Sequence, residues 1–435
     1  MNILYMHSHD TGRYIEPYGY NISTPNLMKL SKEGTLFRNA FSAGATCCPS
    51  RSALLTGMVP HSNGMFGHTS RGFKLNDYGR HIVQFLNRNG FETALCGIQH
   101  EAQDREIIGY HKFLDDPGYP GDNVQIDLYR AELAARYIKQ KKGKPFFLSF
   151  GMKNTHRKFP RPDEEVNPDN VMPPFTLYNA RETREDMAGF ITSARAMDRC
   201  AGIVLDALKE SGHEEDTLVI YTTDHGIAFP RMKSTLYDTG IGVSLIIRFP
   251  GNKRRGQALD ALVSHLDIYP TICDLINIDK PEWLQGTSMT PLFEAETDGI
   301  RSEIFAEMSF HACYEPARCI RTERYKYIKF FDDYDRIVPA HIDDSPGKDF
   351  LINNGYLENP KDREMLFDLY LDPVESKNRV NDGRYSHIHS ELSKRLEKWM
   401  EATCDPLLDG KVPRPEGALV NKLGVISPHS KEYEK

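Results

Sequence analysis

The segment that begins Cys47-Cys48-Pro49-Ser50-Arg51 has residue types and spacing suited to chemistry on an anion. Proline is favoured in the first turn of a helix, which predicts that Cys47 lies at a helix N-terminus. The free backbone N–H groups at such a position favour a bound anion. Arg51, one turn further on, would add a fixed positive charge and paired donors for a tetrahedral oxyanion. A buried structural cysteine would explain the same pattern without any chemistry.

Two pairs of candidate metal ligands each follow a predicted strand. His9 and Asp10 follow the first apolar run of the chain, and Asp224 and His225 follow a strand predicted at 217–223. Strands of one parallel sheet end at the same edge, where such sheets bind ligands. Carboxylate oxygens favour Ca²⁺ or Mg²⁺, whereas two imidazoles shift the preference toward Mn²⁺. The sequence therefore predicts a site for one divalent metal, with Ca²⁺ as the first choice and Mn²⁺ or Mg²⁺ as alternatives.

Three further polar residues are candidates for binding an anion or protonating a leaving group. His100 and His156 follow strands predicted at 92–97 and 145–150, and Lys233 comes shortly after the second metal pair. Histidine and lysine are both common general acids. Each of the three could equally be a structural histidine or a solvated lysine.

The order of predicted elements indicates an α/β fold. Over the first two thirds of the chain, apolar strands alternate with helices predicted after Thr24-Pro25 and at 127–141 and 184–211. Such alternation is typical of a large mixed, mostly parallel sheet sandwiched by helices. The pattern changes near residue 300, and we expect a catalytic domain over 1–300. The rest, 301–435, is expected to form a smaller α+β subdomain with a small antiparallel sheet, a helix at 386–400 and an extended tail.

The segment from Cys47 to Gly57 resembles the signature C-x-P-S-R-x-x-x-x-T-G of the type I sulfatases, which belong to the alkaline phosphatase superfamily. In that family the first cysteine of the signature is oxidised to formylglycine. The resemblance implies that a formylglycine-generating maturation enzyme acts on Cys47, and not on Cys48. One oxygen of the hydrated aldehyde would attack sulfur, and the other would then expel sulfate by re-forming the aldehyde, which is covalent catalysis in two steps.

The resemblance also implies roles for the other candidates. The implied metal ligands are His9, Asp10, Cys47, Asp224 and His225, and the implied catalytic residues are Cys47, Arg51, His100, His156 and Lys233. The chain departs from the family pattern at three places: His9 replaces an aspartate, Ile98 replaces a lysine and Thr155 replaces a proline. Lys153 and Arg105 are candidates to supply the cation that is missing at position 98.

Within the family, several stretches are most similar to the heparan N-sulfatases (sulfamidases), including 61–67, 226–230 and 396–399. This similarity implies a small substrate, an N-sulfated amino sugar. Substrate pockets are built from variable loops, so this inference is weaker than the family resemblance. His61, His68 and Arg71 could line the pocket, or could be ordinary loop residues.

Composition limits the other possibilities. The chain has 435 residues, of which 40% are hydrophobic and 26% charged, and a net charge of −7, so we expect no nucleic-acid partner. No apolar run is long enough for a membrane span, and the N-terminus lacks the features of a secretory signal, so a cytoplasmic protein is expected. The eight cysteines are scattered, unlike a disulfide scaffold. The sequence does not predict an oligomeric state.

Two alternatives to a sulfatase stay open. Phosphonate and phosphate monoester hydrolases of the same superfamily share the signature and can carry an Asp-His metal pair, and sulfate and phosphate are both tetrahedral oxyanions. The substitutions at His9 and Ile98 also allow a catalytically inert protein that binds sulfated glycans.

Overall fold

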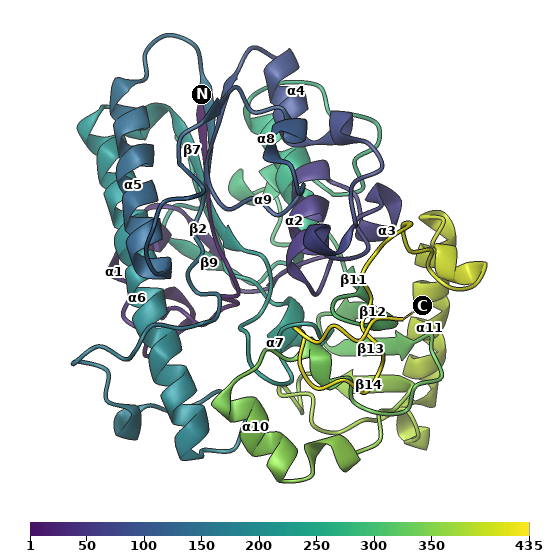
Figure 1. The fold of residues 1–435 in the computed structure, drawn as a ribbon. Helices are drawn as coiled ribbons and strands as arrows, with labels where there is room; N and C mark the ends of the chain where they lie inside the picture. The colour runs from purple at the N-terminus through teal and green to yellow at the C-terminus, as the bar shows by residue number, and fades with distance from the viewer. Residues whose placement is uncertain (435) are drawn as a thin grey trace.

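The computed structural model describes residues 1–434, and its largest element is an eight-stranded sheet (Figure 1). In sheet order the strands are β5 (Lys112–Phe113), β4 (Glu92–Gly97), β6 (Phe146–Gly151), β1 (Asn2–Ser8), β7 (Thr217–Thr223), β8 (Leu245–Arg248), β2 (Thr35–Phe37) and β9 (Gln257–Leu259). The five strands from β5 to β7 are parallel, and β8 is antiparallel to both of its neighbours. The predicted mixed, mostly parallel sheet is confirmed.

Helices cover both faces of this sheet, because successive side chains of a strand point to opposite faces. On β1, Leu4 and Met6 pack in a core with α1, α5 and α6, whereas Ile3 and Tyr5 pack in a second core with α2, α4, α8 and α9. The helices of the two layers are α1 (Pro25–Glu33), α5 (Asn123–Gln140), α6 (Arg181–Glu210), α2 (Cys47–Thr56), α4 (Ile82–Arg88), α8 (Ile268–Leu275) and α9 (Thr290–Phe293).

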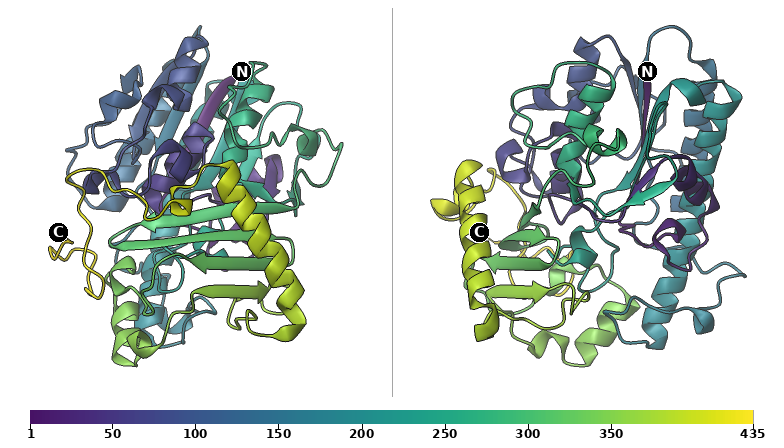
Figure 2. Two further views of the ribbon diagram at one scale, coloured as in Figure 1. Left: turned by 90° about the vertical axis from the view of Figure 1, so that its right-hand side faces the viewer. Right: turned by 180° about the vertical axis from the view of Figure 1, so that it is seen from behind.

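The C-terminal part contains a separate antiparallel sheet of four strands. They are β11 (Glu303–Phe310), β12 (Tyr314–Thr322), β13 (Tyr325–Phe330) and β14 (Glu364–Asp368). Helix α11 (Ser386–Ala402) crosses this sheet and buries Leu392, Leu396 and Met400 against it (Figure 2). A bridge between Gly44 and Glu307 joins β11 to the segment just before Cys47. The predicted C-terminal antiparallel sheet and helix are therefore present.

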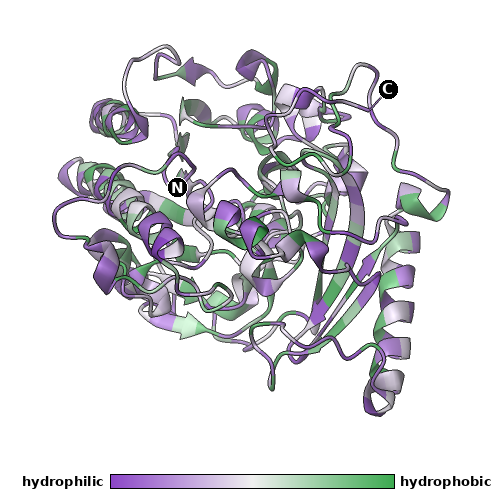
Figure 3. Ribbon diagram, turned by 60° about the horizontal axis from the view of Figure 1, so that its bottom comes forward, coloured by the Kyte–Doolittle hydropathy of each residue, from purple (hydrophilic) through white to green (hydrophobic). Residues whose placement is uncertain are grey.

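Short elements connect these layers. They are β3 (Ala40–Phe41), β10 (Val263–Ser264), α3 (Pro60–Asn63), α7 (Asp238–Ile241) and α10 (Pro346–Asn353). Figure 3 shows hydrophilic and hydrophobic residues interspersed along the helices, as expected for helices with one face on a core. Within residues 1–434, no helix combines the length and the apolar character that a membrane span requires.

Element boundaries differ from the sequence-based predictions where side chains override simple patterns. The helix predicted from residue 127 begins at Asn123, because Asp122 caps it in a capping box with Gln125. Thr24 does hold the N-cap position of α1, but its hydroxyl accepts from the backbone of Glu16 and does not cap the helix.

Candidate active site

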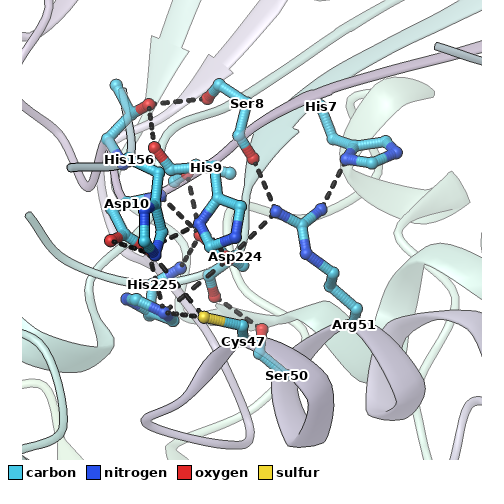
Figure 4. A network of polar contacts seen from close by, with 12 residues as sticks. His7, Ser8, His9, Asp10, Cys47, Ser50, Arg51, His156, Asp224 and His225 are labelled. Carbon is cyan, nitrogen blue, oxygen red and sulfur yellow. Dashed lines mark hydrogen bonds and ion pairs between the residues drawn. The ribbon is translucent and has the colours of Figure 1, made fainter. Parts of the chain in front are cut away.

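The predicted site residues meet at one edge of the large sheet. Strands β4, β6, β1 and β7 are parallel neighbours, so their C-terminal ends lie side by side. The residues that follow these four ends are, in the same order, His100, His156, the pair His9 and Asp10, and the pair Asp224 and His225. Figure 4 shows most of them around the start of α2. All nine positions predicted to be catalytic or metal-binding residues fall in this region or adjoin it.

Cys47 is the first residue of α2, and its side chain points into the site. Its Sγ lies 3.2 Å from Nε2 of His225 and 4.0 Å from Oδ1 of Asp10. The helix is buried over its whole length, so the position of Cys47 is held by surrounding packing. Burial raises the pKa of the unmodified Cys47 thiol well above its usual value, and the carboxylates of Asp10 and Asp224 add to this effect.

Arg51, also in α2, is fully enclosed and joins the helix to two strand ends. Its Nη2 donates to Oδ2 of Asp224 at 2.9 Å and to the carbonyl oxygen of Ser8 at 3.0 Å. Its Nη1 donates to Nδ1 of His7, a residue that the sequence reasoning missed. The only sequence signal for His7 was a histidine inside an apolar strand. Burial alone would raise the pKa of Asp224, but the guanidinium of Arg51 holds it far below its usual range.

Four predicted ligands present a donor set that fits a divalent cation. Nδ1 of His9 lies 2.6 Å from Oδ1 of Asp10 and 3.2 Å from Oδ2 of Asp224. Nε2 of His225 lies 3.3 Å and 3.7 Å from the same two oxygens. Two buried carboxylates and two imidazoles within such distances suit a cation that accepts oxygen and nitrogen ligands.

Burial would raise the pKa of Asp10, but Lys233 and the nearby histidines keep it well below its usual range, so the carboxylate is ionised. Burial lowers the pKa of His9 to about 3, so its ring is neutral near pH 7. The protonation states therefore also suit metal binding, which requires a carboxylate and a neutral imidazole.

Lys233 connects the predicted metal ligand Asp10 to the more exposed His156. Its Nζ lies 2.8 Å from Oδ2 of Asp10, 3.1 Å from Oδ2 of Asp343 and 3.4 Å from Nε2 of His156. The side chain of Lys233 is only 4% exposed, whereas that of His156 is 29% exposed. Asp343 was not predicted, because it lies in a loop of the C-terminal part with no signature around it.

Histidine rings surround His9. Its ring centroid lies 4.4 Å from that of His156 and 4.9 Å from that of His100, both in edge-to-face contacts. His100 in turn contacts His68 at 5.4 Å. His68, His100 and His156 are all partly exposed, so this side is where a substrate can reach the buried residues.

Two of the site residues have a strained backbone. Asp10 has φ 52° and His100 has φ 71°, in the left-handed region that non-glycine residues seldom adopt, at a cost of roughly 1–3 kcal/mol each. Just before His100, Gly97 also has positive φ, and a Cβ there would lie 2.1 Å from the carbonyl oxygen of Gly151. Glycine at position 97 therefore lets the β4 end approach β6 and brings His100 toward His9.

Other candidates lie outside the site. His61 is buried and pairs with Glu307, so it stabilises the fold and does not line a pocket. Arg71 donates to the carbonyl oxygens of Leu419 and Pro428, which ties down the C-terminal tail. Of the three pocket candidates, only His68 reaches the site.

Lys153 and Arg105 were the candidates to supply the cation that Ile98 lacks, and within residues 1–434 neither makes a contact with the other site residues that would support this role. Arg105 pairs with Asp115 and stacks on Phe113, away from the site. Lys153 is partly exposed and follows β6, and its side chain makes no ion pair with any described residue.

The charges of the site leave room for a cation. Two fixed positive groups, Arg51 and Lys233, face three carboxylates, those of Asp10, Asp224 and Asp343. Counting these five groups alone, the site carries one net negative charge, which would repel an anionic substrate. A bound divalent cation would reverse this sign.

The fold and the site define an α/β protein that carries a cysteine at a helix start, beside a donor set that fits a divalent metal. Comparison with known proteins identifies the family. The Sulfatase family model matches residues 2–278, and the model described as N-sulphoglucosamine sulphohydrolase, C-terminal, matches residues 225–348. The chain belongs to the sulfatase family, and it is a sulfuric ester hydrolase.

Individual relatives agree with this assignment. The chain is 30% identical to human N-sulphoglucosamine sulphohydrolase, with 97% of this chain and 93% of the relative covered. A solved structure of a putative sulfatase from Bacteroides thetaiotaomicron superposes with a TM-score of 0.75 at 21% identity, covering 99% of this chain and 98% of that one. The phosphonate monoester hydrolase of Agrobacterium radiobacter superposes with a TM-score of 0.72 at 20% identity, covering 94% and 97%. The two structural matches show a shared fold.

Proposed function

We propose that this protein removes sulfate from a small N-sulfated amino sugar, with Cys47 as the nucleophile after conversion to formylglycine. The position of Cys47 carries the proposal: it starts α2 and lies beside His225, Asp10 and Arg51. The likeness to N-sulphoglucosamine sulphohydrolase over almost the whole chain supports the N-sulfated substrate.

We also propose that His9, Asp10, Asp224 and His225 hold one divalent cation, together with the modified residue 47. Ca²⁺ is the first candidate because of the two carboxylates, and the two imidazoles keep Mn²⁺ and Mg²⁺ as alternatives. When bound, the cation would withdraw negative charge from the sulfate oxygens. Arg51 would hold Asp224 in place through its 2.9 Å contact and add positive charge on the same side.

In the first step, one hydroxyl of the hydrated formylglycine loses its proton as it attacks sulfur, the bond from sulfur to the sugar nitrogen breaks, and the proton count balances when that nitrogen gains one. The leaving nitrogen must gain a proton as it departs. His156 and Lys233 are placed for this role at the mouth of the site, 3.4 Å from each other. Lys233 is held by two carboxylates, which raise its pKa above its usual value, and His156 is the more exposed of the two.

In the second step, the remaining hydroxyl of residue 47 loses its proton and the aldehyde re-forms. The carbon–oxygen bond to the sulfated oxygen breaks, and sulfate leaves. His100 is our candidate to accept that proton, because burial lowers its pKa and leaves the ring neutral, and its Nδ1 has no hydrogen-bond partner among the described side chains. Water then hydrates the aldehyde and restores the starting state.

A phosphonate or phosphate monoester hydrolase is the second candidate. The fold is shared with a phosphonate monoester hydrolase, and Ile98 stands where the sulfatase pattern has a lysine. An inert glycan-binding protein is less favoured, because the donor set and the helix-borne Cys47 are both in place.

A substrate panel tests the proposal. The protein would be co-expressed with a formylglycine-generating enzyme, and release of sulfate and phosphate would be measured from N-sulfoglucosamine, an O-sulfated sugar, an aryl sulfate and an aryl phosphate. We expect sulfate release with preference for the N-sulfated sugar. Dominant phosphate release would support the second candidate. No release from correctly modified protein that still binds the sulfated sugar would support the inert alternative.

A further inference from the structure

A second group of metal-binding side chains adjoins the catalytic site but lies outside the proposed ligand set. It consists of Cys48, His68 and His100, and one ligand atom from each lies within 4.8 Å of the others. Cys48 follows Cys47 in the first turn of α2 and is buried. His68 precedes a short helical turn at 69–71, and His100 follows β4, so three separate segments meet here.

The two histidines each offer a ring nitrogen to a cation. Nδ1 of His100 is buried and has no hydrogen-bond partner among residues 1–434, and leaving such an atom unsatisfied costs about 1–3 kcal/mol. Nδ1 of His68 lies 2.8 Å from Oγ of Ser70, and in one tautomer its N–H donates a hydrogen bond to that oxygen. That tautomer leaves the Nε2 lone pair free for a metal, and a hydrogen bond on the other nitrogen is typical of metal-bound histidine. In the other tautomer, Nδ1 accepts from the backbone N–H of Ser70 at 3.2 Å instead.

Cys48 is placed to act as a thiolate ligand. The backbone N–H of Thr69 donates to its Sγ at 3.4 Å, and the N-terminus of a helix stabilises a thiolate. Without a cation, burial raises the pKa of Cys48 to about 12, so the thiol keeps its proton. A bound metal would displace that proton, as metals do at cysteine sites.

We propose that Cys48, His68 and His100 bind a soft divalent cation such as Zn²⁺, at a site separate from the carboxylate-bearing one. One thiolate and two imidazoles with an open fourth position form a common zinc ligand set. Zn–S and Zn–N bonds of about 2.3 Å and 2.0 Å require ligand atoms about 3.3–3.6 Å apart. His68 and His100 are partly exposed and can close the remaining distance by small side-chain movements.

The two sites should prefer different metals, because their ligand atoms differ. Ca²⁺ and Mg²⁺ prefer oxygen ligands, whereas thiolate and imidazole select Zn²⁺ and similar ions. Occupancy would take His100 away from residue 47, so a soft cation would inhibit the enzyme reversibly. This inhibitory consequence rests on the proposed function, whereas the binding site itself does not.

Cobalt spectroscopy tests the binding site directly. Co²⁺ would be added to full-length protein carrying Cys47→Ala, in which Cys48 is the one thiol of the two metal sites. We expect a thiolate-to-cobalt charge-transfer band that excess Ca²⁺ does not remove. The band should disappear in the further variant Cys48→Ser and persist in Cys313→Ser, a matched change at another buried thiol. Absence of the band, or its persistence in Cys48→Ser, would overturn the proposal.

A second variant covers the case in which Cys48→Ser does not fold, as judged by circular dichroism. His68 is partly exposed, so His68→Asn should fold, and it should weaken Co²⁺ binding by at least about tenfold. Unchanged affinity in that variant would refute the site.

Measuring activity at increasing Zn²⁺ concentration tests whether a cation at this site inhibits the enzyme. In formylglycine-converted enzyme, Cys48→Ser should leave the activity without Zn²⁺ unchanged and raise the Zn²⁺ concentration for half-inhibition at least about tenfold. Equal sensitivity in both forms would contradict the inhibitory role. The cobalt band reports metal binding and does not require catalysis. It therefore tests the binding site even if the protein is not a sulfatase of the proposed kind.

Discussion

The two sides of the candidate site are built differently. On the nucleophile side, Cys47, Arg51 and Asp224 are buried on a helix start and a strand end, and Arg51 ties these elements together. On the mouth side, His100 and His156 are partly exposed and come from loops after strands. We propose that the rigid half sets the reaction at sulfur, whereas the half built from loops sets the leaving-group and substrate preference.

The largest effect is expected on the nucleophile side. Asp224→Ala should remove a metal ligand and the partner of Arg51, and lower kcat/KM by about 10³-fold, equivalent to several kcal/mol of lost charge stabilisation. Elemental analysis should show loss of the bound cation, and a chelator should no longer lower Tm.

Asp198→Ala is the matched control for that change. Asp198 is also a buried carboxylate, but it is not one of the proposed metal ligands. It accepts hydrogen bonds from backbone N–H groups at the start of α1. It should reduce stability and keep the metal. Unchanged metal content in Asp224→Ala would refute the ligand assignment.

A smaller and substrate-dependent effect is expected at the mouth. His156→Asn should slow release from N-sulfoglucosamine by about 10²-fold, because the amine leaving group needs a proton. An aryl sulfate, whose phenolate leaves without help, should be affected less than about threefold. His389→Asn is a suitable control, since both histidine side chains are 29% exposed and His389 pairs with Glu364 elsewhere. Equal losses on both substrates would show that His156 is not the proton donor.

The smallest effect is expected at Asp343. Asp343→Asn removes one of the two carboxylates that hold Lys233, and a partly exposed ion pair contributes up to about 1 kcal/mol. We expect kcat/KM for the sugar substrate to fall about two- to fivefold, with little change in metal content. A loss as large as that of Asp224→Ala would break the division between the two sides.

The sequence predicted residues on both sides of the site. Cys47, Asp10, Asp224 and the histidines after β4 and β6 could be found because parallel strands end at one edge and the signature marks a helix start. Asp343 could not be found, because tertiary packing alone brings its loop to Lys233. That Arg71 lies outside the site likewise depends on a partner distant in sequence, Pro428.

Fold prediction shows a similar limit. The alternation of strands and helices was sufficient to predict the sheet and its two helical layers. The boundaries depended on local side-chain contacts, such as the capping box of Asp122 with Gln125. The antiparallel β8 within the parallel sheet had no clear signal in the sequence.

The central claim is that formylglycine at position 47 is the nucleophile, and it is tested most directly by relating activity to modification. Protein would be prepared with and without a formylglycine-generating enzyme, and the modified fraction of the peptide Asn39 to Arg51 would be measured by mass spectrometry, with Cys47→Ala as the blank. We predict that sulfate release rises in proportion to the formylglycine fraction and is absent from the blank. Equal turnover by fully unmodified protein, or by Cys47→Ala, would contradict the claim.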